Sequence, residues 1–135
     1  MTRIFVCATW SALALSLCVA GCAQLREELQ RAETAYDQTH YDEALVWLTD
    51  LENDTPDMDM SQRARFYYLR GMSAYRLGKR NDALHFLALA REVSGDNAEG
   101  LRPEWKDTMD RTLTELTPTS ATSRARGQAA PSATP

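Results

Sequence analysis

Few residues in this sequence carry side chains suited to covalent or metal chemistry. The three cysteines, Cys7, Cys18 and Cys22, all lie near the N-terminus, and the histidines are His40 and His85. The two histidines lack metal-ligand spacing, and no His-Glu-x-x-His, phosphate-binding glycine loop or Gly-x-Ser-x-Gly motif occurs. We therefore expect no enzyme activity, no metal and no cofactor, and the thiol of Cys22 is the main candidate for covalent chemistry.

The pair Asp57 and Asp59 superficially suggests a calcium-binding loop. In such a loop the sixth residue is glycine and the twelfth is a bidentate glutamate. This sequence has Gln62 and Tyr68 at those positions. A helix N-cap near Ser61 is the better interpretation of this segment.

The segment 1–21 has the pattern of a signal peptide. A short basic start, Met1-Thr2-Arg3, precedes an apolar run from Ile4 to Ala20. A spanning helix needs about 20 apolar residues, and no basic stop-transfer cluster follows this run. The remaining alternative is an uncleaved signal anchor.

The run ends in Val19-Ala20-Gly21-Cys22. This stretch resembles the lipobox of bacterial lipoproteins, in which the cysteine is acylated and becomes the mature N-terminus. The resemblance implies a lipidated N-terminus at residues 22–23 and attachment by two or three acyl chains, which is effectively permanent. Ala23, rather than aspartate, implies sorting to the outer membrane, facing the periplasm. Processing also removes Cys7 and Cys18, so no disulfide could form; in an uncleaved anchor, Cys22 would be inert.

An internal repeat occupies the middle of the chain. Aligning the sequence with itself at an offset of 39 gives seven identities and several pairs of similar class, among them Ala32 with Gly71 and Trp47 with Phe86. The identical pairs are Arg26/Arg65, Arg31/Arg70, Ala35/Ala74, Tyr36/Tyr75, Ala44/Ala83, Leu45/Leu84 and Leu48/Leu87. Apolar and small residues recur at intervals of three and four, which predicts two helices in each unit.

The second unit resembles the tetratricopeptide repeat, a helix pair of about 34 residues. Gly71, Ala83 and Ala90 occupy its small-residue positions, Leu87 its bulky position and Gly78 its turn. The first unit matches less well, and the longer offset in this chain implies an insertion near 57–60. Arginines replace the expected leucine in both units, so an unrelated pair of helical hairpins remains the alternative.

The prediction is an all-α fold: a short α-solenoid of two tetratricopeptide-like hairpins with a C-terminal capping helix, over residues 24–116. Trp105, Met109, Leu113 and Leu116 recur at helical intervals after Pro103 and supply the cap. The five helices are expected at 24–38, 41–54, 61–77, 80–94 and 103–116. Residues 117–135 are rich in Thr, Ser, Ala and Pro, which predicts a disordered tail.

Charge divides the chain into two opposed parts. Residues 23–60 hold eleven acidic side chains and two arginines, whereas residues 61–81 hold six basic side chains and no acidic one. One interpretation is that the two parts form surface ion pairs. The other is a peptide-binding groove on the first helix of each unit, which the resemblance implies. Its residues would be Arg65, Tyr68, Met72, Tyr75 and Arg76, with Arg26, Leu29, Glu33, Tyr36 and Asp37 from the first unit.

Such a groove would suit a peptide that carries carboxylates. The sequence therefore predicts a membrane-anchored adaptor that binds an envelope protein or peptide of unknown identity. The alternative is a structural lipoprotein that self-associates through the Trp105 helix or an open end of the solenoid. Nucleic-acid binding is not expected, because the 135-residue chain has a net charge of −4 and carries an export signal.

Overall fold

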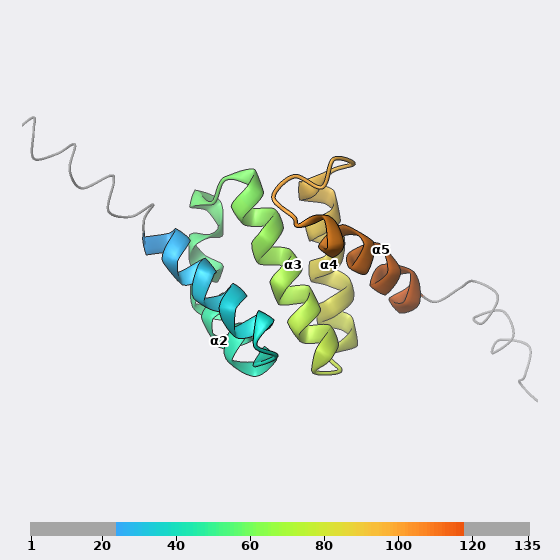
Figure 1. The fold of residues 1–135 in the computed structure, drawn as a ribbon, viewed down its shortest axis with the longest axis horizontal. Helices are drawn as coiled ribbons and strands as arrows, with labels where there is room; N and C mark the ends of the chain where they lie inside the picture. The colour runs from blue at the N-terminus through green and yellow to red at the C-terminus, as the bar shows by residue number, and fades with distance from the viewer. Residues whose placement is uncertain (1–23, 118–135) are drawn as a thin grey trace, which may run out of the picture.

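A computed structural model describes residues 24–117, and all regular structure in that range is helical (Figure 1). The predicted all-α class is therefore confirmed. The predicted signal peptide, the lipidation site at Cys22 and the tail from residue 118 lie outside the described residues.

Five α-helices and one 3-10 helix make up the described chain. They are the N-terminal helix (residues 24–37), α2 (Tyr41–Asp50), η1 (Leu51–Asp57), α3 (Met60–Arg76), α4 (Arg80–Ser94) and α5 (Pro103–Leu116). Four of the five predicted ranges agree with these bounds to within one residue at either end.

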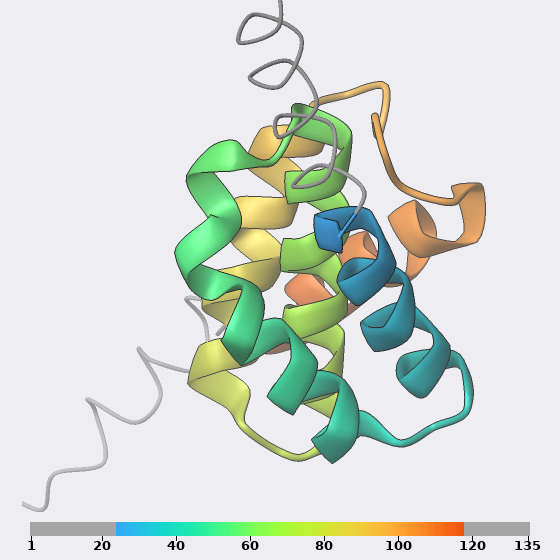
Figure 2. The ribbon, with the colours of Figure 1, turned by 90° about the vertical axis from the view of Figure 1, so that its left-hand side faces the viewer.

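The second predicted range, 41–54, is wrong at its C-terminal end. The α-helix ends at Asp50, and η1 continues its spiral in 3-10 form (Figure 2). Pro56 lies inside η1 and lacks an N–H group, so it cannot contribute to an α-helical ladder. Much of the extra length of the first unit is accommodated by this 3-10 segment.

The cap of α3 is Asp59 rather than Ser61. The backbone N–H of Gln62 donates to the Asp59 side chain at 2.8 Å, and the N–H of Asp59 donates to the Gln62 side chain at 3.0 Å. This reciprocal pair is a capping box. Asp59 is therefore the N-cap of α3, two residues before the position near Ser61 that the sequence predicted.

The two hairpin turns have the same geometry. Equivalent backbone hydrogen bonds join residues 34–40 in the first hairpin and 73–79 in the second, and the bond closing each turn is 2.9 Å long. The central residues, Thr39 and Gly78, have φ angles of 65° and 74°. The internal repeat is therefore a repeat of structure as well as of sequence.

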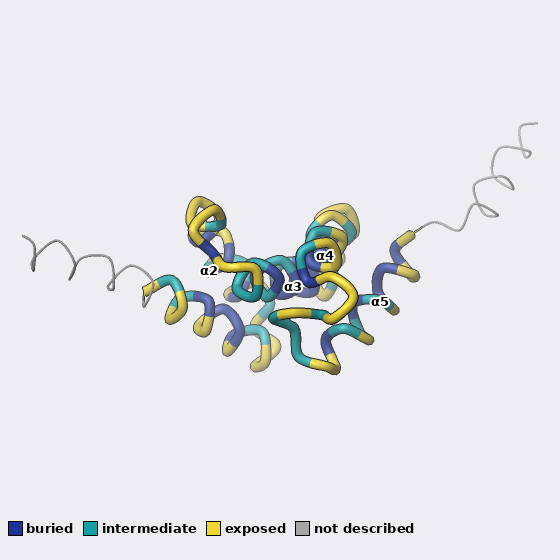
Figure 3. Tube along the Cα trace, turned by 90° about the horizontal axis from the view of Figure 1, so that it is seen from above, coloured by how far each residue is buried: buried dark blue, intermediate teal, exposed yellow. Residues whose placement is uncertain are grey.

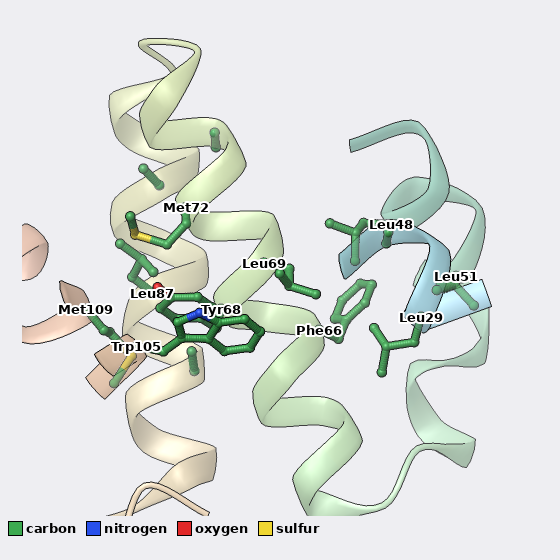
Figure 4. Packing of buried hydrophobic residues seen from close by; sticks show 14 of the residues in the cluster. Leu29, Leu48, Leu51, Phe66, Tyr68, Leu69, Met72, Leu87, Trp105 and Met109 are labelled. Atoms are coloured by element: carbon green, nitrogen blue, oxygen red, sulfur yellow. The ribbon is translucent and has the colours of Figure 1, made fainter. Parts of the chain in front are cut away.

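Helix α3 lies at the centre and packs in two directions. Toward the first hairpin it directs Phe66 at Leu29, Leu48 and Leu51 (Figure 4). Toward α4 and α5 it directs another group, which Figure 4 also shows: Tyr68 and Met72, beside Leu87, Trp105 and Met109. These side chains are buried and belong to one continuous core.

Viewed from above, α2 and α4 lie on one side of α3, and the N-terminal helix and α5 lie on the other (Figure 3). Successive helical residues turn by about 100°, so side chains three, four and seven apart share a face of α3. Residues 63, 67, 70, 74 and 77 lie on the α2–α4 side, and residues 65, 68, 72, 75 and 76 lie on the other.

Candidate functional site

The predicted peptide-binding groove is largely filled by the chain itself. Tyr68 is 1% exposed and Met72 is fully buried. The Trp105 ring stacks on Tyr68 with a centroid distance of 4.5 Å and meets Tyr36 edge-on at 6.4 Å. The prediction that Tyr68 and Met72 line an open groove is therefore wrong, because the N-terminus of α5 covers them.

Arg102 fastens this cover to the N-terminal helix. Its guanidinium donates to both carboxylate oxygens of Asp37, at 3.0 and 3.4 Å, and to Glu33. It also lies over the Trp105 ring, 4.4 Å from the centroid. We call this set, Arg102 with Glu33, Asp37 and Trp105, the Arg102 clamp.

The loop before Arg102 is held at close range to α3. Gly100 has a φ angle of 80°, and a Cβ atom there would lie 2.4 Å from the carbonyl oxygen of Ser61. Glycine is required at this position for both reasons. The close approach brings Arg102 and Trp105 over the predicted groove.

Hydrogen bonds and burial shift the pKa values of Arg102 and of the two tyrosines beneath Trp105. The hydrogen bonds from Arg102 to Asp37 and Glu33 raise the pKa of the guanidinium, so it stays cationic. Burial raises the pKa of the Tyr68 hydroxyl, and to a smaller extent that of Tyr36. Both phenols therefore remain neutral near pH 7.

Several of the other predicted groove residues also make internal contacts. Arg65 lies 3.5 Å from the buried carboxylate of Glu33, and the Tyr75 hydroxyl donates to Glu115 at 2.8 Å. Leu29 is buried in the core, Tyr36 and Asp37 contact the cover, and Arg26 and Arg76 are exposed. The structure thus favours the ion-pair interpretation of the charge asymmetry for Arg65 and Arg70 of α3, which pair with Glu33 of the N-terminal helix and Glu52 of η1.

Trp105 itself is buried, so its side chain is not available to a second copy of the chain. The side of α5 that carries Trp105, Met109 and Leu113 faces the core. Self-association through the Trp105 helix would therefore use the opposite, exposed side of α5.

The opposite face of α3 is open. A hollow of about 420 Å³ lies between α2 and α4, with α3 as its floor. We call it the α2–α4 groove, and its apolar lining consists of Leu45, Val46, Ala74, Leu77 and Phe86. A second hollow of about 640 Å³ adjoins it at Phe86 and is lined by η1, α3 and α4.

Arg70 lies between the two hollows. Its guanidinium is 4.3 Å from the centroid of Phe86, and it donates to Glu52 of η1 at 3.0 Å. Arg31 stands in the same relation to Trp47 in the first hairpin, at 5.6 Å. The aligned arginines and aromatic residues in the sequence were the signal for these two cation–π pairs, which sequence reasoning missed.

The rim of the α2–α4 groove is acidic. Asp42 and Asp50 come from α2, and Asp82 from the first turn of α4. None of the three forms an ion pair with another described residue. Lys79 is the cation at one end of the groove, whereas Arg70 is engaged by Glu52.

Within residues 24–117, no cluster of three or more His, Cys, Asp or Glu side chains has a geometry suited to a metal ion. In the same range, no helix combines the length and apolarity needed to cross a membrane. No protein-family model, curated protein or solved structure matches this chain.

Proposed function

We propose that this protein is a lipid-anchored interaction module of the bacterial envelope, attached to the outer membrane and facing the periplasm. Its helical domain, in the form of a short tetratricopeptide-like solenoid, binds a segment of another envelope protein. The single observation that carries the proposal is the position of the motif Val19-Ala20-Gly21-Cys22, directly before a folded domain that begins at residue 24.

The structure of the domain supports binding rather than another role. Its two helical hairpins repeat the same turn geometry, and α5 packs on α4 as a closing element. It also exposes an apolar groove with unpaired carboxylates, a combination typical of a surface that receives another protein.

Lipidation is tested by feeding cells a clickable fatty acid and comparing Cys22→Ser with Cys18→Ser. We expect the label to disappear from the Cys22 variant and to remain on the Cys18 variant, because only Cys22 follows the lipobox pattern. Label retained on Cys22→Ser, or absent from the unmodified protein, would overturn the anchor.

Adaptor activity is tested by cross-linking the lipidated protein in intact cells and identifying the products by mass spectrometry. The proposal expects a defined heterologous envelope protein, cross-linked to residues 24–117. Products containing only this chain would contradict it and favour self-association.

One observation favours that second candidate. Arg70 of the second hairpin donates to Glu52 of η1, whereas within residues 24–117 the equivalent Arg31 pairs only with Glu27 of its own helix. A second copy could pack on Arg31 and Trp47. Sedimentation of Trp47→Asp against the unmodified chain tests this: loss of a dimer would support it, and a monomer in both would exclude it.

A further inference from the structure

Two exposed apolar side chains meet in the α2–α4 groove. Among the described residues, three large hydrophobic side chains are classed as exposed, and two of them, Val46 at 60% and Leu77 at 42%, line this groove. Val46 comes from α2 and Leu77 from the end of α3. Together with Phe86 and Leu45 they form an apolar surface between two helices.

The three carboxylates are placed around this surface. Asp42, Val46 and Asp50 follow one another at intervals of four on α2, so they form one stripe along the helix. Asp82 and Phe86 have the same spacing on α4, which forms the facing wall. An occupant would therefore meet apolar atoms in the centre and carboxylates on both walls, with the cation Lys79 at one end of the groove.

We propose that the α2–α4 groove binds a cationic amphipathic helix of a partner protein, with apolar residues against Val46, Leu77 and Phe86 and with Lys or Arg beside the carboxylates. Charge complementarity selects this partner, and two bounding helices suit the helix-in-groove mode of recognition. The inference rests on the proposed function and names its surface and partner class. The sequence predicted a peptide with carboxylates on the side of α3 that α5 covers. The proposed partner is instead cationic and binds the opposite side.

The tail of the chain is a poorer occupant. Residues 118–135 supply Arg124 and Arg126, but they contain no Leu, Ile, Val, Met or aromatic residue to cover the apolar centre. Burial of apolar area is the main favourable contribution in such docking. The groove therefore fits a partner helix better than it fits this tail.

The test uses the full chain in nanodiscs of zwitterionic phosphatidylcholine. The probe is a fluorescent helical peptide of about four turns, with leucines at intervals of three and four residues and lysines elsewhere. A second peptide has glutamate in place of every lysine. Fluorescence anisotropy, corrected with protein-free nanodiscs, measures both affinities, and we expect binding of the lysine peptide to be at least about tenfold tighter.

Matched variants locate the binding surface. The change Asp42→Asn with Asp50→Asn and Asp82→Asn should weaken the lysine peptide about tenfold or more, and so should Val46→Ser with Leu77→Ser. The control, Asp54→Asn with Asp57→Asn and Asp96→Asn, removes the same charge from exposed residues outside the groove lining and should bind normally. Circular dichroism melting checks that each variant is folded.

Three results would overturn the proposal: equal binding of the two peptides, an equal loss in the control variant, or tighter binding when Arg124 and Arg126 are changed to Ala. The last result would assign the groove to the tail. None of these results bears on acylation at Cys22 or on heterologous cross-linking. A failure of the groove is therefore distinguishable from a failure of the proposed function.

Discussion

The two hairpins share a turn, a sequence pattern and a cation–π pair, yet they differ at the small-residue position of their first helices. In the first hairpin this position is Ala32, aligned with Leu48 of the second helix, and both residues are fully buried. In the second hairpin Gly71 takes the place of Ala32, because a Cβ atom there would lie 2.7 Å from a side-chain carbon of Leu87 and 2.9 Å from its backbone nitrogen. In the second hairpin the backbone of α3 therefore packs directly against α4, which an alanine at that position would not permit.

The hairpins also differ in what covers them. Helix α5 packs against both helices of the second hairpin, whereas it meets the first through Trp105 and Arg102 at its N-terminus. Equivalent residues of the two hairpins therefore contribute unequally to the stability of the fold, since burial rather than residue type determines that contribution.

The largest expected effect is at the close helix contact. Gly71→Ala should destabilise the fold by about 2 kcal/mol, because the added methyl group meets backbone as well as side chain and α4 must shift. The mirror change, Ala32→Gly, should cost about 1 to 1.5 kcal/mol, through backbone entropy and the loss of a buried methyl group. Urea unfolding measures the loss in free energy of unfolding for each variant, and equal losses would contradict the tighter packing at Gly71.

The next effect concerns the stacked arginines. Arg70→Ala should cost about 1 to 2 kcal/mol, since its side chain is 14% exposed and contacts Phe86 and Glu52. Arg31→Ala should cost less than about 0.5 kcal/mol, because that side chain is 52% exposed. Urea unfolding of the two variants compares the costs, and a larger loss for Arg31→Ala would contradict this ranking.

Arg70→Met separates packing from charge in the same assay. If contact with Phe86 is the main contribution, methionine should retain most of the stability that alanine loses. A loss as large as that of Arg70→Ala would assign the effect to the Glu52 ion pair instead.

The smallest effect is at the two turns. Thr39→Gly should stabilise the protein by about 0.5 to 1 kcal/mol, because it relieves a positive φ angle. Gly78→Ala should destabilise it by about 1 kcal/mol for the same reason, as nothing lies within 4 Å of the added Cβ atom. Thermal melting of both variants measures these effects. Melting temperatures that shift in the same direction would refute this account.

Helix positions and the repeat were predictable from the sequence because small and apolar residues recur at helical intervals around Gly71, Leu87 and Ala83. The end of α2 was missed, since the 3-10 form of η1 depends on Pro56, which lies beyond the last α-helical turn. The cover over Tyr68 was missed for a different reason. It depends on Gly100 and Arg102, which belong to a loop. A loop has no hydrophobic periodicity from which its path could be predicted.

The location of the α2–α4 groove was also beyond sequence reasoning. The charge asymmetry was visible, but which arginines would be neutralised depended on contacts such as Arg65 with Glu33. Once these are paired, the carboxylates of α2 and α4 remain, so the sign of the free surface is opposite to that of helix α3.

The Arg102 clamp has a consequence for folding. The repeat contacts are mostly local, whereas the clamp joins side chains that lie 65 and 69 positions apart in the chain. Closing so long a loop costs more entropy than forming the local contacts within a hairpin, so we expect the clamp to form after the hairpins. Because it ties the C-terminal end of the N-terminal helix to the N-cap of α5, these two helix ends cannot separate without breaking it, and amide hydrogens on either side of the clamp should exchange as one cooperative unit.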